Sequence, residues 1–219
     1  MGEPVQVGEN NMSKEVMAVD FDDCIIPFDT PFRQWALTEH AIVLDKEKAV
    51  KGKFHYDEAY PESGLTSSLT GQLIDQYLAE ASVETVPYDG VIEDLQMLID
   101  FFDLQIVTAR PPEHRDVTVA SIERHIGAGV FSAVHTAEYN GDHKLTSKVS
   151  TYRRIDAKVA IDDADHNVNA AIEAGLIGIS VQYPEHTHNG HNLHEDALVV
   201  ASLKEIITLG TPRVVNGPR

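Results

Sequence analysis

The chain has 219 residues, a formal net charge of −18 and a single cysteine, Cys24. Its length is typical of one core domain with an insertion or a small second unit, and 42% hydrophobic residues suffice for a sizeable core. The acidic balance argues against nucleic-acid polymers and anionic membranes as partners, because both attract basic surfaces. A lone cysteine excludes an internal disulfide framework and fits a reducing compartment.

No apolar run is long enough to span a bilayer, and residues 1–14 have the composition of a flexible tail rather than of a signal peptide. We therefore expect a soluble, cytoplasmic protein that is not associated with a membrane. The sequence leaves open whether it is a monomer or a homodimer.

Short apolar segments alternate with segments that have helical spacing or helical start and stop signals. The apolar segments, which have the length of buried strands, are 15–19, 104–108, 132–136, 157–161 and 177–181. The helical segments are 90–102, 112–129, 145–154, 166–174 and 197–208. This alternation predicts an α/β fold, a Rossmann-like parallel sheet with helices on both faces.

One span interrupts the alternation. Residues 29–88 contain two helix-like stretches joined by a polar, irregular connection. We interpret this span as a small helical insertion after the first strand. The core then consists of residues 15–28 and 89–219.

Polar side chains, most of them acidic, stand where three of the predicted strands end. They are Asp20, Asp22 and Asp23 after the first strand, Thr108 at the end of the second, and Asp162 and Asp163 after the fourth. The carboxyl ends of parallel strands converge at one edge of the sheet, which is where such sheets bind ligands. Clustered carboxylates repel one another, and a hard divalent cation relieves that repulsion. The pattern predicts a Mg²⁺ site with oxygen ligands.

Three short motifs mark the same strand ends: VDFDDC at 19–24, LQIVTARP at 104–111 and VAIDDADHNVNAAIEAG at 159–175. Together they resemble the first, second and fourth motifs of the haloacid dehalogenase superfamily of phosphatases. Each motif alone is weakly specific, but all three stand in the right order after predicted strands. The insertion lies where that family often carries a small helical cap over its active site.

The resemblance implies a role for each matching residue. Asp20 would be the nucleophile that forms an aspartyl-phosphate, and Asp22 would protonate the leaving oxygen and later deprotonate the attacking water. Thr108 would donate hydrogen bonds to the transferred phosphoryl group. A lysine would neutralise the charge of that group; Lys148 has the better spacing from the fourth motif, and Lys144 is the alternative.

The same resemblance implies a ligand set for Mg²⁺. Asp20 and the backbone carbonyl of Asp22 would bind the ion, Asp163 falls where the family keeps its other direct ligand, and Asp162 would orient a metal-bound water. Asn167 departs from the pattern, since many members have an aspartate there.

The predicted substrate is a small phosphorylated molecule. Arg110 and Lys144 are candidates to bind its phosphate, and the aromatic residues Phe32 and Trp35 of the insertion are candidates to stack on a nucleobase, together with the aromatic residues of 54–60. These features resemble the 5'(3')-deoxyribonucleotidase branch, which implies a nucleoside monophosphate. Two alternatives stay open: the aromatic residues form the core of the cap, or the substrate is a sugar phosphate or phosphoglycolate.

A histidine-rich segment, residues 183–196, follows the predicted strand at 177–181. Its histidines are His186, His188, His191 and His194. This spacing is compatible with a transition-metal site, with substrate contact or with a solvated loop.

Two functions without hydrolysis compete with the phosphatase hypothesis. A phosphoacceptor domain of the receiver type also uses acidic residues, a threonine and a lysine around Mg²⁺. Its acidic pair follows the first strand and its phosphorylated aspartate a middle strand, whereas here the pair Asp162 and Asp163 comes near the end of the chain, which also carries a cap. A catalytically silent binding protein on the same fold would retain clustered carboxylates at a cost in stability. We therefore favour the enzyme.

Overall fold

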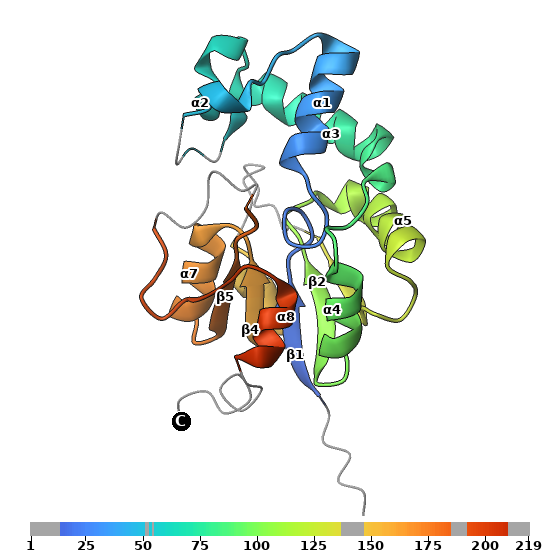
Figure 1. The fold of residues 1–219 in the computed structure, drawn as a ribbon, viewed down its shortest axis with the longest axis vertical. Coiled ribbons are helices and arrows are strands. Elements are labelled where there is room, and N and C mark those ends of the chain that lie inside the picture. The colour runs from blue at the N-terminus through green and yellow to red at the C-terminus, as the bar shows by residue number, and fades with distance from the viewer. Residues whose placement is uncertain (1–13, 51–52, 54, 137–146, 185–191, 210–219) are drawn as a thin grey trace, which may run out of the picture.

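The computed structural model describes residues 14–50, 53, 55–136, 147–184 and 192–209. At its centre is a six-stranded sheet in the order β3-β2-β1-β4-β5-β6 (Figure 1), and every pair of neighbouring strands is parallel. The strands are β1 (Glu15–Val19), β2 (Phe102–Val107), β3 (Ala133–His135), β4 (Ala157–Asp162), β5 (Ile177–Val181) and β6 (Leu198–Val200). The predicted α/β fold with a parallel sheet is confirmed.

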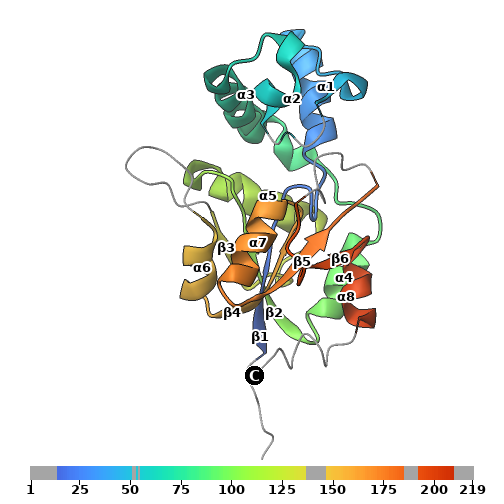
Figure 2. The same cartoon turned by 90° about the vertical axis from the view of Figure 1, so that its left-hand side faces the viewer.

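Helices cover both faces of the sheet, as the view in Figure 2 shows. They are α4 (Val91–Leu98), α5 (Arg115–His125), α6 (Val149–Arg154), α7 (Asp165–Glu173) and α8 (Leu203–Thr208). Met17 and Val19 of β1 point to the face that packs against α4, α5 and α8. Ala18, between them, packs on the other face against α6 and α7. Successive residues of β1 thus point to opposite faces of the sheet, and helices bury both faces. For that reason residues 15–19 form a continuous apolar run in the sequence.

Two sequence-based boundaries are wrong. The helix expected over 90–102 ends at Leu98, because Phe102 is buried and pairs with Glu15 as the first residue of β2. The helix expected over 197–208 is preceded by β6, which pairs with β5 at the edge of the sheet. A strand of three residues is too short to show a period in the sequence.

The segment between β1 and α4 forms a helical unit above the carboxyl ends of the strands (Figure 1). Its helices are α1 (Asp29–His40), α2 (Tyr56–Ala59) and α3 (Ser67–Glu80), and its short 3₁₀ turns are η1 (Lys46–Lys48), η2 (Pro61–Ser63) and η3 (Ser82–Glu84). Thr66 caps α3 by accepting a hydrogen bond from the Leu69 N–H at 3.2 Å. We call this unit the cap.

The cap has a hydrophobic cluster of its own. Phe32 and Ala36 of α1 are fully buried there and pack with Leu73 and Tyr77 of α3. A separate core of this kind lets the cap hold its shape without burying its helices in the sheet. Its aromatic rings also contact one another, for example Phe32 and Tyr77 with ring centroids 5.6 Å apart.

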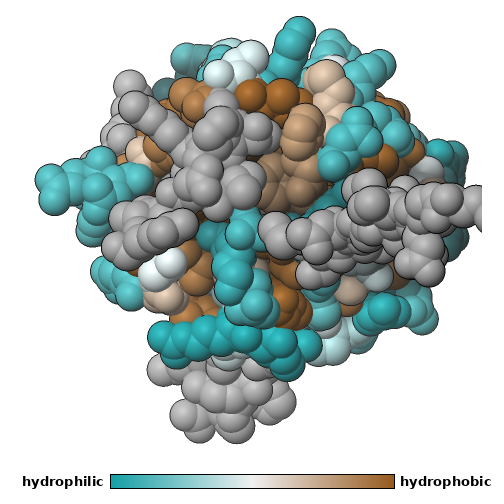
Figure 3. Space-filling view, turned by 90° about the horizontal axis from the view of Figure 1, so that it is seen from below, coloured by the Kyte–Doolittle hydropathy of each residue, from teal (hydrophilic) through white to brown (hydrophobic). Residues whose placement is uncertain are grey.

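The opposite end of the sheet, at the amino ends of the strands, faces the viewer in Figure 3. Hydrophobic and hydrophilic residues are interspersed in that view. Within the described residues, no helix is both long and apolar enough to cross a membrane. The tail predicted over 1–14 lies outside the described residues except for Lys14.

Candidate active site

The site forms where the strand order changes direction. β1 lies between β2 and β4, and Val19 at its end pairs with Ile106 on one side and Ile161 on the other. The three strands end at the same level of the sheet. Asp20 directly follows β1, Thr108 directly follows β2, and Asp162 is the last residue of β4. Ligands of open parallel sheets bind at such switch points.

Lys148 connects two of these strand ends. Its ammonium nitrogen lies 2.8 Å from Asp20 Oδ1 and 2.7 Å from Asp162 Oδ2, and only 5% of its side chain is exposed. Burial by itself lowers the pKa of Lys148, but the carboxylates of Asp162 and Asp20 hold it well above its usual value. The lysine is therefore charged between two carboxylates. Lys144, the alternative, lies outside the described residues.

Asp162 is fully buried and bound to protein donors through both oxygens. Its Oδ2 accepts a hydrogen bond from Lys148, while its Oδ1 accepts from the Ala164 N–H at 3.0 Å and from Asn167 Nδ2 at 3.1 Å. These contacts tie Asp162 to Lys148 and to the start of α7, and Asn167, which departs from the family pattern, is one of the donors. The orientation of a metal-bound water by Asp162 stays a prediction.

Asp20 and Asp163 are the two carboxylates best placed to hold a cation. Their oxygen atoms and Cys24 Sγ lie within 4.8 Å of one another, and all three residues are buried. Burial, opposed by Lys148, raises the pKa of Asp20 well above its usual value, and the charges of Asp162 and Asp163 raise it further. Asp20 Oδ1 is itself buried and is paired with the Lys148 ammonium at 2.8 Å.

The charge balance of this region also favours a cation. Among the residues that the structure describes, five carboxylates stand at or beside the strand ends, and two buried basic side chains contact three of them. The acidic residues are Asp20, Asp22, Asp23, Asp162 and Asp163, and the basic ones are Lys148 and Arg110. Carboxylates brought together in a buried region repel one another, and a divalent ion with oxygen ligands would offset that repulsion. The residues present therefore fit Mg²⁺, with Asp20 and Asp163 as ligands; the backbone carbonyl of Asp22 stays a predicted one.

Cys24 contributes a sulfur atom to this cluster. Burial raises the pKa of its thiol well above the usual range, and the nearby charge of Asp163 raises it further. A protonated thiol is a poor ligand for a hard cation. The donor set therefore consists of oxygen atoms.

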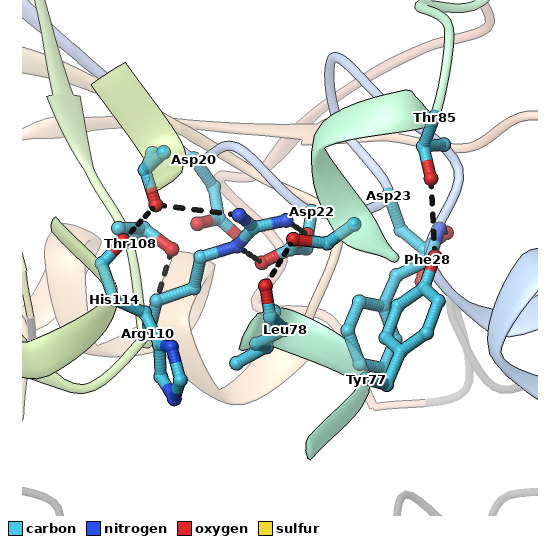
Figure 4. A network of polar contacts seen from close by, with 12 residues as sticks. Asp20, Asp22, Asp23, Phe28, Tyr77, Leu78, Thr85, Thr108, Arg110 and His114 are labelled. Atoms are coloured by element: carbon cyan, nitrogen blue, oxygen red, sulfur yellow. Dashed lines mark hydrogen bonds and ion pairs between the residues drawn. The ribbon is translucent and has the colours of Figure 1, made fainter. Parts of the chain in front are cut away.

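Asp22 is held by an arginine from the next motif. Arg110 donates two hydrogen bonds to it, from Nε to Oδ2 at 2.8 Å and from its NH2 group to Oδ1 at 2.7 Å (Figure 4). The backbone N–H of Arg110 also donates to Thr108 Oγ1 at 3.2 Å. Arg110 was a candidate to bind the substrate phosphate; in the structure its guanidinium binds the carboxylate of Asp22, and the residue also lines the adjacent cavity, so phosphate binding stays a prediction.

A cavity of about 1100 Å³ lies next to these residues and is shared by the core and the cap. On the core side it is lined by Asp20, Asp22 and Lys148, and on the cap side by Tyr56 and Tyr60. The two tyrosine rings are stacked with centroids 6.0 Å apart and planes 14° apart. The cap therefore presents a partly aromatic wall to the strand ends.

Tyr56 and Tyr60 were among the aromatic residues put forward for stacking, but two other candidates, Phe32 and Trp35, are placed differently. Phe32 is fully buried in the cluster of the cap, and Trp35 packs against it with ring centroids 6.2 Å apart. Neither residue lines the cavity. Substrate contact by Phe32 is thus wrong for this conformation, and its ring serves the core of the cap, the alternative that the sequence left open.

No protein-family model and no curated protein sequence matches the chain. Solved structures do. A haloacid dehalogenase-like hydrolase from Streptococcus pneumoniae is 13% identical, with a TM-score of 0.63 over 90% of this chain and 98% of that one. A haloacid dehalogenase-type hydrolase, YfnB from Bacillus subtilis, bound to magnesium, is 16% identical, with a TM-score of 0.59 over 90% and 99%.

CbbY from Rhodobacter sphaeroides, solved in complex with phosphate, is 14% identical, with a TM-score of 0.56 over 88% of this chain and 96% of that one. A mutant of CbbY, solved with xylulose-(1,5)bisphosphate, has a TM-score of 0.55. The chain has the haloacid dehalogenase-like fold. Identities this low establish a shared fold, and the chemistry has to be argued from the residues.

Within this haloacid dehalogenase-like fold, Asp23 was counted with the acidic cluster in the sequence but anchors the loop after β1. Its Oδ1 accepts hydrogen bonds from the Phe28 N–H at 2.8 Å and from Tyr88 Oη at 3.1 Å. Its φ of 56° lies in the left-handed region, which aspartate tolerates better than most residues. A turn-forming aspartate and a ligand cannot be told apart by sequence alone.

Three histidines of the predicted histidine-rich loop, His186, His188 and His191, lie outside the described residues. The backbone N–H of His194 donates to Asn169 Oδ1 at 2.7 Å, which ties this segment to α7. His194 does not line the cavity.

Proposed function

We propose that the protein is a Mg²⁺-dependent phosphomonoesterase that works through an aspartyl-phosphate intermediate. The observation that carries this proposal is the buried arrangement of Lys148 between Asp20 and Asp162, with Asp163 beside Asp20, at the mouth of a large cavity. Phosphoryl transfer needs an in-line nucleophile and a way to neutralise charge, and these residues supply both. The haloacid dehalogenase-like fold of the solved hydrolases supports the same reaction class.

The reaction has two steps. In the first, a carboxylate oxygen of Asp20 attacks phosphorus, the bond from phosphorus to the ester oxygen breaks, and the leaving oxygen takes a proton from Asp22. In the second, a water attacks the phosphorus of the aspartyl-phosphate and gives a proton to Asp22, which frees Asp20 and inorganic phosphate. Asp22 lines the cavity and keeps 22% of its side chain exposed, as such a proton carrier must.

Lys148 would neutralise the charge of the transferred phosphoryl group, and Thr108 would donate a hydrogen bond to it. The ammonium of Lys148 would lie beside the transferred group, since it contacts the nucleophile directly. The Thr108 hydroxyl accepts a hydrogen bond from the Arg110 N–H, which leaves its own hydrogen to donate to a phosphoryl oxygen. Mg²⁺, held by Asp20 and Asp163, would lower the repulsion between the nucleophile and the phosphate dianion.

For the substrate we propose a nucleoside monophosphate. The cavity volume of about 1100 Å³ exceeds the needs of a phosphate group alone, and the rings of Tyr56 and Tyr60 add aromatic surface to its lining, on which a base would stack. A sugar phosphate is the second candidate, because the similarly folded CbbY mutant was solved with a sugar bisphosphate.

Phosphate release by the purified protein tests the proposal. The panel contains nucleoside 5'- and 3'-monophosphates, sugar phosphates and phosphoglycolate, each with Mg²⁺ and with EDTA. Asp20→Asn should fold normally and release no phosphate, while the exposed Asp89→Asn serves as its control. Release confined to sugar phosphates would move the substrate and keep the mechanism. No Mg²⁺-dependent release from any ester, or full activity of Asp20→Asn, would contradict the mechanism and favour a silent binding protein.

A further inference from the structure

Arg110 contacts residues from two separate motifs at once. Its backbone N–H donates to the hydroxyl of Thr108, and its guanidinium donates to both carboxylate oxygens of Asp22. Asp22 and Arg110 are far apart in the chain and meet only because β1 and β2 are neighbours in the sheet. One residue therefore fixes the positions of two groups that the proposed reaction uses.

The guanidinium is itself held on its remaining sides. Its NH1 group donates to Thr118 Oγ1 on α5 at 3.3 Å, and its central carbon lies 4.8 Å from the centre of the Phe21 ring. Thr118 in turn donates to the His114 carbonyl at 2.9 Å. Figure 4 shows the guanidinium of Arg110 directed at the carboxylate of Asp22. An arginine fork bound in this way has little freedom left.

The exposures of the two partners show which one restrains the other. The side chain of Arg110 is 2% exposed, whereas that of Asp22 is 22% exposed and reaches the cavity. A mobile carboxylate at the edge of a cavity can adopt several rotamers, and each rotamer would place its oxygens differently. Bonding to a fixed fork selects one of them.

The pairing leaves Asp22 able to exchange protons. An ionised carboxylate offers about four lone-pair sites, and a bidentate arginine occupies two of them. The other sites stay available on the side that faces the cavity. We propose that Arg110 is a positioning residue, which holds the carboxyl group of Asp22 at the leaving oxygen of the substrate. This inference rests on the proposed phosphomonoesterase function.

The leaving group reports on this role. A benzyl alkoxide needs a proton from Asp22 as its bond to phosphorus breaks, whereas 4-nitrophenolate is stable enough to leave without one. The ratio kcat/KM covers the steps up to that bond cleavage. A misplaced Asp22 should therefore lower kcat/KM for benzyl phosphate far more than for 4-nitrophenyl phosphate, while lost substrate binding would lower both equally.

The experiment compares Arg110→Lys with the unmodified protein on these two esters. Lysine keeps the positive charge but lacks the fork, so we expect kcat/KM to fall on the order of 10²-fold for benzyl phosphate and by less than about tenfold for 4-nitrophenyl phosphate. Arg124→Lys is the matched control, because Arg124 also pairs with a carboxylate, Glu84, but on the surface. It should behave like the unmodified protein.

A double-mutant cycle separates positioning from general damage to the fold. The cycle adds Arg110→Lys to a protein that already carries Asp22→Asn. In that background the substitution should change kcat/KM for benzyl phosphate by no more than about threefold. The ratio of the kcat/KM values for the two esters should also stay within about threefold. An equal loss on both esters, or a full effect of Arg110→Lys in that background, overturns the inference and leaves the proposed function intact. Failure of the unmodified protein to release phosphate from these two esters and from every ester of the panel above overturns the proposed function as well.

Discussion

Lys148 Nζ lies 2.8 Å from Asp20 Oδ1, and both side chains are more than nine-tenths buried. The charge of Lys148 opposes the burial that raises the pKa of Asp20, and so favours the ionised carboxylate that attacks. The second contact of the lysine, with Asp162, prevents it from turning away. Lys148 therefore serves both the chemistry and the stability of the site.

Lys148→Met tests both roles, since methionine has a similar length and no charge. We expect turnover to fall by at least about 10²-fold, because the phosphoryl charge is no longer neutralised. We also expect the metal-free protein to lose about 3–5 kcal/mol in the free energy of unfolding, because buried carboxylates lose their partner. Phosphate release and urea unfolding in EDTA measure the two effects.

Lys158→Met is the matched control, because Lys158 pairs with Asp156 at the surface, where such pairs contribute little. It should change neither quantity noticeably. If Lys148→Met unfolds at the same urea concentration as the unmodified protein, Lys148 does not hold the carboxylates together as the distances indicate.

Magnesium should stabilise the folded protein through Asp163. An ion that binds only the folded state at 100 times its Kd adds about 2.7 kcal/mol. Asp163→Asn should abolish most of that gain and should leave the metal-free protein as stable as before or more so, because one source of repulsion at Asp20 is gone. Thermal unfolding across a Mg²⁺ titration measures this. An unchanged Mg²⁺ effect in the variant would mean that Asp163 is no ligand.

The same carboxylates give the metal-free protein a characteristic pH dependence. Burial raises the pKa of Asp20 in the folded state above its unfolded value near 3.8, so the folded form binds this proton more tightly. Stability should therefore fall as the pH rises from the unfolded value through the raised folded one. Thermal unfolding in EDTA over this range should show the decline, and Asp20→Asn should reduce it. A stability that rises steadily over the same range in both proteins would contradict this assignment.

The sequence was sufficient to predict the sheet and the chain positions of the strand ends. Apolar runs buried on both faces are easy to find, and residues that follow them share one edge of the sheet by geometry alone. That is why Asp20, Thr108 and Asp162 could be grouped from separate motifs. Lys148 was chosen over Lys144 by spacing alone, and the structure brings it to two of these residues.

The direction of side chains could not be predicted in the same way. Arg110 and Phe32 were both assigned to the substrate because of their residue types, yet one faces Asp22 and the other the core of the cap. An arginine shortly after the end of a strand can point to substrate or to a nearby carboxylate. Which carboxylate lies near Arg110 depends on β1, a strand far away in the sequence. Likewise, the three residues of β6 carry no periodic signal.

Cys24 distinguishes a hard cation from a thiophilic one. Its thiol lies among the possible ligand atoms, but burial raises its pKa and keeps it protonated. Cys24→Ala should therefore retain Mg²⁺-dependent phosphate release within about threefold and cost roughly 1 kcal/mol in stability from the small cavity left behind. Loss of metal dependence, with stability unchanged, would instead identify the sulfur as a ligand. The native thiol should also resist alkylation at neutral pH until the protein unfolds.

Tyr56 tests how the cap selects its substrate, because it lines the cavity while Trp35 does not. If the ring stacks on a nucleobase, Tyr56→Leu should cost about 1–3 kcal/mol, or roughly 5- to 150-fold in kcat/KM for nucleoside monophosphates. It should cost much less for sugar phosphates, which have no aromatic base. Tyr56→Phe keeps the ring and loses only the hydrogen bond to Asp29, so it should stay close to the unmodified protein with nucleotides.

Trp35→Leu is the comparison that isolates the cavity from the cap as a whole. Its ring packs within the cap against Phe32 and Tyr77, so its loss should lower stability and affect all esters alike. A selective loss of nucleotide turnover in Trp35→Leu, with none in Tyr56→Leu, would mean that the cap changes its arrangement when substrate binds. The aromatic wall seen here would then not be the surface that selects the base.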